Sequence, residues 1–112
     1  MYARYIRETQ NKEMLETPHG FLTYGFNCVP GVTELHVYVV DIYVIPEMRK
    51  TYAATSMVDA VVEIAKERGC KLLFGTVNAK SSDPNRSLSF LRAYGFRLCS
   101  IATDTLWMVK DI

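Results

Sequence analysis

Two different spacings of apolar residues divide the chain into predicted strands and helices. The longest apolar run, ELHVYVVDIYVI (34–45), is rich in β-branched and aromatic residues, which predicts a central strand covered on both faces. Asp41 places one carboxylate inside that run. From about Tyr52 to Arg68 the apolar residues recur with the spacing of one helical stripe, and Gly69 ends the helix. That stripe consists of Met57, Val58, Val61, Ile64 and Ala65.

Turn residues place the other elements. Pro30-Gly31 predicts an antiparallel hairpin whose second arm is the central strand. Asp83 and Pro84 have the residue types of an N-cap and a first helical position, and Gly95 ends the short helix that they begin. The order strand, helix, strand around 52–68 implies a right-handed parallel crossover. The other predicted strands are 2–8, 21–27, 71–78, 96–102 and 106–111.

Composition restricts the class of protein. The chain has 112 residues, 49% hydrophobic and 22% charged, which predicts a single soluble domain over 1–112. A net charge of +1 gives no field that would attract nucleic acid, and no apolar run is long enough for a membrane span. From the polar start we expect no signal peptide, and three widely spaced cysteines form no zinc or disulfide pattern. We therefore expect buried thiols, no metal and a cytoplasmic location.

The junction after the central strand has the features of an anion site. In VIPEMRKTYAAT (44–55), a strand runs into Pro46 and a helix opens after Arg49. The first amides of a helix lack acceptors and lie at its positive end, where phosphate binds. Arg49 and Lys50 add positive charge, and Thr55 adds a hydroxyl. The alternative is a solvated basic turn, since phosphate sites of this kind usually use glycine, and Tyr52 stands where glycine would allow close approach.

Three motifs in this order resemble the GNAT N-acetyltransferase superfamily, over about 34–110. That family has V-x-P-x-x-R followed by a Gly-rich loop opening a helix, and this chain has VIPEMR (44–49) followed by KTYAA (50–54). The family's ERGCKRLYLTV is similar to ERGCKLLFGTV (67–77). Its FYEKLGF is similar to FLRAYGF (90–96).

The resemblance implies a fold and a co-substrate. The fold would be α/β (an α+β mixed sheet), with a splayed parallel strand pair, flanking helices and reduced N-terminal helices. Acetyl-CoA would lie in the resulting V-shaped cleft, with its acetyl group toward Asp41. Its pantetheine arm would pair with the backbone of Tyr43, Val44 and Ile45. Its diphosphate would meet the amides of Arg49, Lys50, Thr51, Tyr52, Ala53, Ala54 and Thr55, and Asn85 would lie near the arm.

The chain departs from the family pattern at three places. Tyr52 replaces the loop glycine, and its side chain either turns outward or fills the diphosphate space. Leu91 occupies the position of the tyrosine that often protonates the leaving thiolate, and Tyr94, one helical turn later, is the substitute. Only 33 residues precede the central strand. One sheet face would then be bare, which suggests a homodimer that covers it.

Acyl transfer to an amine requires a group that accepts the amine's proton. Asp41 is the candidate base, because a carboxylate in an apolar strand should have a raised pKa if it is unpaired. The alternative is that Asp41 caps a turn, pairs with an arginine or faces solvent at a bulge. His36 faces away from Asp41 by alternation, which favours a structural histidine. Tyr43 shares the face of Asp41 and either lines the acceptor pocket or packs.

Two functions remain open from the sequence. The first is an enzyme that transfers an acetyl group from acetyl-CoA to an amine of a small molecule, peptide or protein. The second is a catalytically inactive binding module of the same fold, acting through protein–protein interaction. Tyr52 and Leu91 are the residues that favour the second.

Overall fold

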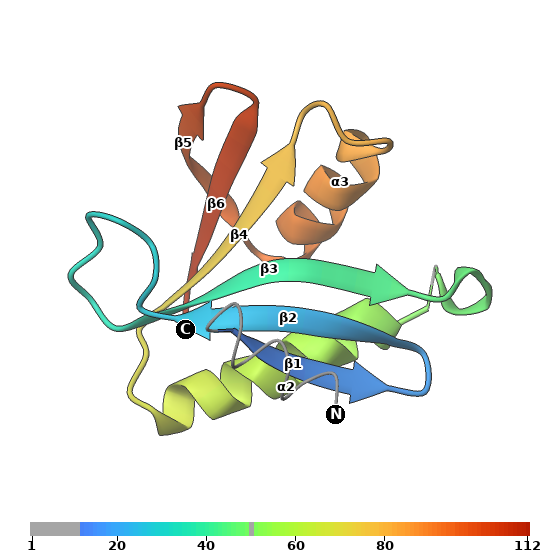
Figure 1. Cartoon of the computed structure of the whole chain (residues 1–112), viewed down its shortest axis with the longest axis horizontal. Helices are drawn as coiled ribbons and strands as arrows, with labels where there is room; N and C mark the ends of the chain where they lie inside the picture. The colour runs from blue at the N-terminus through green and yellow to red at the C-terminus, as the bar shows by residue number, and fades with distance from the viewer. Residues whose placement is uncertain (1–11, 50) are drawn as a thin grey trace.

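The computed structural model describes residues 12–49 and 51–112. They form one six-stranded sheet with strand order β1-β2-β3-β4-β6-β5 and two α-helices (Figure 1). The elements in chain order are β1 (Glu13–Thr17), β2 (Gly20–Phe26), β3 (His36–Val44), the 3₁₀ turn η1 (Pro46–Met48), α2 (Ala53–Glu67), β4 (Leu72–Asn78), α3 (Pro84–Tyr94), β5 (Arg97–Ala102) and β6 (Thr105–Asp111).

The sheet is mixed, and its one parallel pair comes apart along its length. Strands β3 and β4 pair in parallel from His36–Leu72 to Val39–Gly75, and no pairing follows. Every other neighbouring pair in the sheet is antiparallel. Figure 1 shows β1, β2 and β3 as one block and β4, β6 and β5 as another, diverging from a common end. The predicted mixed sheet with a splayed parallel pair is confirmed.

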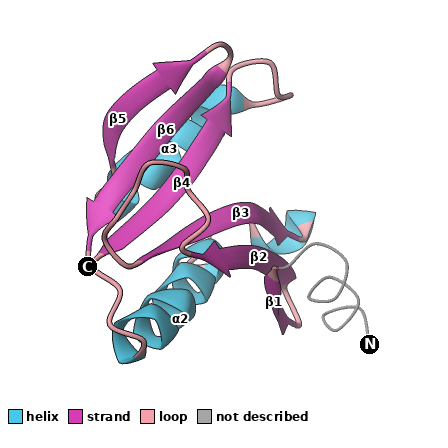
Figure 2. Cartoon of the chain, turned by 60° about the vertical axis from the view of Figure 1, so that its left-hand side comes forward, coloured by secondary structure: helices cyan, strands magenta, loops and turns pink. Residues whose placement is uncertain are grey.

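Both helices cover the same face of the sheet. Helix α2 lies against β1, β2 and β3, and α3 lies against β4, so each block has its own helix (Figure 2). Apolar residues repeating along the inner face of α2 drive this packing, because each buried aliphatic side chain contributes about 1.5–3 kcal/mol. The fully buried core contains Leu22, Val37, Val58, Val61, Ala65, Leu73, Val77 and Met108.

A β-bulge in β3 reverses one prediction about which residues share a face. Thr23 of β2 pairs with Asp41, but the next residue, Tyr24, pairs with Val39, so Val40 is an extra residue in β3. The bulge shifts the alternation by one residue. Asp41 therefore lies on the same face as His36, and the predicted opposite orientation is wrong.

His36 has a structural role on that face. It is 1% exposed, and its Nε2 accepts a hydrogen bond from the amide of Val29 at 3.0 Å. Its Nδ1 lies 2.8 Å from the carbonyl oxygen of Glu34. Both ring nitrogens are used to hold the loop before β3, which confirms the expectation of a satisfied histidine.

The N-terminal part of the sheet differs from the prediction. The expected strand 2–8 lies outside the described residues, and the first described strand is β1 (13–17), which the sequence did not indicate. The turn predicted at 16–20 joins β1 to β2. Within the described part, no α-helix precedes β3, in agreement with the expected reduction of N-terminal helices.

Candidate active site

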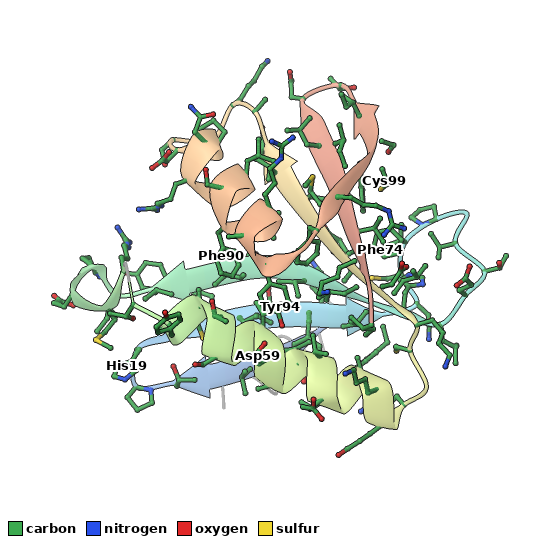
Figure 3. All side chains as sticks on the ribbon, turned by 180° about the vertical axis from the view of Figure 1, so that it is seen from behind. His19, Asp59, Phe74, Phe90, Tyr94 and Cys99 are labelled. Carbon is green, nitrogen blue, oxygen red and sulfur yellow. The ribbon has the colours of Figure 1, made fainter. Side chains whose placement is uncertain are left out.

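A cleft opens where β3 and β4 separate. It has a volume of about 720 Å³ and begins at Val39 and Gly75, the last residues of the parallel pair. The C-terminal half of β3, the end of β4, the first turn of α2 and the inner side of α3 form its walls (Figure 3). Its polar lining residues are Asp41, Tyr43, Arg49, Thr51, Thr76, Asn78, Ser81, Arg86, Ser87 and Ser89.

The β3 wall offers an unpaired strand edge. Residues 41–44 pair with β2 on one side only, so their backbone groups facing β4 have no strand partner in the described chain. An extended ligand can pair with such an edge as an added strand would. Two atoms at its far end are already used: the Ile45 amide donates to the carbonyl oxygen of His19 at 2.8 Å, and the Val44 carbonyl accepts from Arg49 Nε at 3.0 Å. The Tyr43 carbonyl oxygen points at Gly20 of β2, so of the predicted backbone contacts only that of the Val44 amide faces the cleft.

The turn between β3 and α2 is held together by its own side chains. Arg49 folds back onto the strand, with its guanidinium 5.7 Å from the centre of the Tyr43 ring. The Thr51 hydroxyl donates to the Met48 carbonyl at 2.5 Å and accepts from the Ala53 amide at 3.2 Å. The predicted Lys50 contact lies outside the described residues.

Two amides at the start of α2 remain available for an anion. The Ala53 amide is satisfied by Thr51, and the Ser56 amide donates to the Tyr52 carbonyl at 2.8 Å. The amides of Ala54 and Thr55 have no acceptor among the described residues. Free amides at the positive end of a 15-residue helix favour a negatively charged group.

Tyr52 does not fill the space beside these amides. It is the N-cap residue of α2, and its side chain is 83% exposed. It is not among the residues that line the cleft; it lines a second hollow between α2 and α3. Of the two orientations left open by the sequence, the structure has the outward one.

Asp41 reaches the cleft, but not as a buried carboxylate. The side chain is exposed and lies next to the bulge at Val40. Strand β3 was expected to be covered on both faces, yet Asp41 and Tyr43 are both exposed, because β3 separates from β4 after Val39 and neither described helix covers this face. The apolar burial expected around Asp41 is therefore absent, while its position at the cleft wall stands.

Helix α3 supplies the opposite wall with a second cation. The Asp83 carboxylate caps the helix by accepting from the Arg86 amide at 3.1 Å, and Gly95 ends it at φ 116°, both as predicted. Arg86 and Ser87 line the cleft, whereas the predicted Asn85 does not. The sequence did not single out Arg86 for the cleft, nor Asn78 at the end of β4, nor Ser81 from the loop before α3. Their one signal is position, since they follow the carboxyl end of a parallel strand.

Tyr94 lies away from the cleft. Its hydroxyl donates to Asp59 Oδ1 at 2.5 Å, which ties α3 to α2 (Figure 3). Burial first, then the hydrogen bond and the negative charge of Asp59, raises the pKa of Tyr94 well above its usual range. Tyr94 lines the second hollow with Tyr52 and Thr55, apart from Asp41 and the other predicted residues that line the cleft. Leu91, at the family's tyrosine position, is 7% exposed and packs beside Gly75 and Phe96.

The described residues contain no cluster of metal-binding side chains, and no described helix is long and apolar enough to cross a membrane.

Cys28 and Cys99 are exposed, so the expectation of three buried thiols is wrong for these two. Cys99 is the extra residue where the register of β5 against β6 shifts, and Cys28 lies in the loop after β2. Cys70 is buried, and burial raises the pKa of its thiol, opposed by the nearby charge of Arg68.

Solved structures share this architecture. A GNAT-family acetyltransferase structure from Desulfovibrio desulfuricans matches with TM-score 0.74 at 16% identity, over 89% of this chain and 68% of that one. PaiA N-acetyltransferase from Thermoplasma acidophilum, in complex with coenzyme A, matches with TM-score 0.70 at 17% identity, over 96% and 66%. A Bacillus subtilis acetyltransferase in complex with CoA gives TM-score 0.70 at 16% identity, over 97% and 83%.

The sequence itself carries the family signature. No match was found among curated protein sequences. The sequence model of the acetyltransferase (GNAT) family matches residues 6–96, which is most of the chain. Together with the splayed β3–β4 pair, this match shows that the chain belongs to the GNAT acetyltransferase family.

Proposed function

We propose that residues 1–112 form one domain that transfers an acetyl group from acetyl-CoA to a primary amine of a small molecule, peptide or protein. The observation that carries the proposal is the continuity of the cleft. An unpaired strand edge on β3 leads to Ala54 at the start of α2, whose amide and that of the next residue are free, with Arg49 on one wall and Arg86 on the other. Coenzyme A is bound in two of the similar structures.

The residues present fit the separate parts of that co-substrate. A diphosphate suits the Ala54 and Thr55 amides, which are preorganised donors, and the two arginines add charge. The pantetheine arm carries amide groups that can pair with the edge of β3, and its alkyl parts suit the apolar lining from Val77, Phe90 and Leu91. The outward orientation of Tyr52 leaves room for this arrangement.

The transfer reaction needs a proton acceptor and a stabilised carbonyl oxygen. In the proposal, Asp41 accepts the amine's proton, directly or through water, as the amine nitrogen attacks the thioester carbon. In the proposal, the amides of Ile42 and Val44 on the unpaired edge donate to the carbonyl oxygen as it gains charge. The carbon–sulfur bond then breaks, and the sulfur takes a proton from water. Thiols are far more acidic than alcohols or amines, so the sulfur can leave as the thiolate without a protein acid. Tyr94 has no part in this step.

Leu91 is the residue that favours the alternative function, an inactive binding module. A buried leucine stands where the family often has its acid, so a CoA-binding module without turnover is the alternative. Binding and turnover must therefore be measured separately.

Binding is tested by thermal unfolding with and without acetyl-CoA. Ligand at 100 times its dissociation constant should add about 2.7 kcal/mol to the free energy of unfolding. Arg49→Ala should weaken binding, and Arg49→Lys is the matched control that keeps the charge but loses the Nε bond to Val44. An unchanged melting temperature at millimolar acetyl-CoA would refute the proposed cofactor site.

Turnover is tested by thiol release against a panel of primary amines. Asp41→Asn should lower kcat by at least tenfold while leaving the dissociation constant of acetyl-CoA within about twofold. Binding without thiol release toward any amine would favour the inactive module. Equal loss of binding and turnover in Asp41→Asn would exclude Asp41 as the base.

Location and assembly complete the proposal. Two exposed free thiols suit a reducing compartment, which supports a cytoplasmic protein.

Exposed Asp41 and Tyr43 lie on the sheet face that neither described helix covers, and a second copy of the chain would cover this face in the proposed homodimer. Light scattering at micromolar concentration gives the mass, and a 12.8 kDa species would exclude the dimer.

A further inference from the structure

Two hydroxyl groups meet where β3 and β4 separate. Thr76 is the first residue of β4 beyond the last parallel pair, Val39–Gly75, and it lines the cleft. Tyr38 lies on β3 just before that pair, and its hydroxyl oxygen is 3.0 Å from Thr76 Oγ1. A side-chain hydrogen bond therefore joins the two strands at the vertex of the cleft, and the transfer steps proposed above make no use of it.

The strand registers place Thr76 and Asp41 on the same face of the sheet, one on each wall. Phe74 lies on the face of His36, with the two rings 5.3 Å apart, and Thr76 follows Phe74 by two residues. The bulge at Val40 turns Asp41 to that same face. A carboxylate and a hydroxyl thus border the open side of the cleft from opposite strands.

The walls are close enough at the vertex for both groups to reach one nitrogen atom. At Val39 and Gly75 the strands are one ladder spacing apart, about 4.8 Å, and they separate beyond that pair. A nitrogen that donates two hydrogen bonds spans up to about 6 Å between its two acceptors. Acceptor groups on the two walls just beyond the vertex can therefore hold the same amine.

Tyr38 is held in place to orient the Thr76 hydroxyl. Its half-buried ring packs against Trp107 with 5.4 Å between the centroids, and Trp107 is the strand partner of Thr76 on β6. A phenol is more acidic than an aliphatic alcohol, so Tyr38 is the better donor and Thr76 accepts. Thr76 Oγ1 makes no other hydrogen bond within the described chain, so its second lone pair and its own hydrogen stay available to the cleft.

We propose that Thr76, oriented by Tyr38, accepts one N–H of the neutral acceptor amine while Asp41 accepts the other. The inference rests on the proposed function, because the amine must attack beside Asp41. With one N–H held by each wall, the nitrogen lone pair is directed at the thioester carbon. Asp41 takes the proton that the amine loses, and the N–H that the amide product keeps stays on Thr76. A primary amine has two N–H bonds and a secondary amine has one, so this second contact makes the protein selective for primary amines.

Matched primary and N-methylated amines test the inference through thiol release. The probe pairs are n-butylamine with N-methylbutylamine, benzylamine with N-methylbenzylamine, and glycinamide with sarcosinamide. Thr76→Val removes the hydroxyl at nearly constant shape, and it should lower kcat/KM for a primary amine at least about fivefold, the low end of the effect of an unpaired N–H. For the N-methylated amine, whose single N–H goes to Asp41, kcat/KM should change by less than about threefold. Thr76→Ser keeps the hydroxyl and should retain most of the native preference, and the dissociation constant of acetyl-CoA should stay within about twofold in both variants.

Tyr38→Phe tests the orienting role separately. It removes the phenol oxygen and leaves the ring against Trp107, so it should reduce the preference for the primary amine in the same direction as Thr76→Val, by a smaller factor. An unchanged preference would remove Tyr38 from the proposal. In urea unfolding, the double variant should lose less stability than the sum of the two single losses, because both substitutions break the same hydrogen bond. Additive losses would contradict the contact between the two hydroxyls.

The outcomes separate this inference from the function on which it rests. If the native chain acetylates a primary amine and Thr76→Val does so equally well, the Thr76 contact is excluded while the transferase function stands. Equal losses toward both members of a pair would assign Thr76 to the thioester or to the shape of the vertex, and would overturn its contact with the amine. A native chain that acetylates both members equally well would refute the selectivity. If none of the three primary amines releases thiol from the native chain, the proposed function fails for them, and the inference fails with it.

Discussion

Leu91→Ala tests how the cleft wall is built. Leu91 is 7% exposed, and its two methyl carbons lie 3.5 and 3.7 Å from the point where a side chain on Gly75 would begin. The substitution removes three buried carbon atoms, worth about 2.4 kcal/mol of transfer free energy. A void within a closed core would add a cavity term, but this void joins the open cleft. We therefore expect a loss of about 2.5–3 kcal/mol, near the low end for such changes.

Urea unfolding followed by circular dichroism measures this loss, with an unchanged m-value showing that the denatured state is the same. Leu98→Ala is the matched control, because Leu98 is 48% exposed on β5 and should lose only about 1 kcal/mol. Equal losses in the two variants would refute the placement of Leu91 in the wall between α3 and β4.

Three further substitutions have defined outcomes. Asp83→Ala should cost about 1 kcal/mol in urea unfolding, because it removes the cap on the Arg86 amide, whereas Asp83→Asn should cost a few tenths. Gly20→Ala should lower the free energy of unfolding by about 2 kcal/mol or more, because its new carbon would lie 1.9 Å from the Tyr43 carbonyl oxygen. Gly75→Ala is the control, since its new carbon meets only ordinary contacts and should lower that free energy by less than about 1 kcal/mol. Tyr94→Phe should cost about 1 kcal/mol at pH 8. The pKa of Tyr94 is raised in the folded state, so the stability that its hydroxyl contributes is complete below the unfolded-state pKa near 10 and shrinks as the pH rises further. The difference in free energy of unfolding between the native chain and Tyr94→Phe should therefore narrow from about pH 9.5 to 11. A difference that stays constant over this range would contradict the Asp59 contact.

Local patterns predicted most of the elements. The apolar stripe from Met57 to Ala65 lies on the buried side of α2, because helical periodicity depends on neighbouring residues alone. Asp83 and Gly95 mark the ends of α3, where cap chemistry is equally local. Strand β1 was missed, since EMLET has no distinct strand composition and is a strand through its pairing with β2.

The predicted site was recovered in part. Asp41, Arg49 and Ala54 share one cleft, as the order of motifs implied. Asn85 and Tyr94 do not line it, because the rotation of a helix about its axis is set by packing, and a residue one position away points elsewhere. Arg86, the neighbour of Asn85, lines the α3 wall of the cleft instead.

Residues close together along the chain were enough to predict the order of elements from β2 onward, the caps of α3, the family and the turn between β3 and α2. Tertiary structure alone decided that β3 and β4 separate after Val39, that the bulge at Val40 turns Asp41 to the face of His36, and that Tyr52 points outward. These depend on how two sheet blocks with separate helices pack together, and no local pattern records the free energy of that packing.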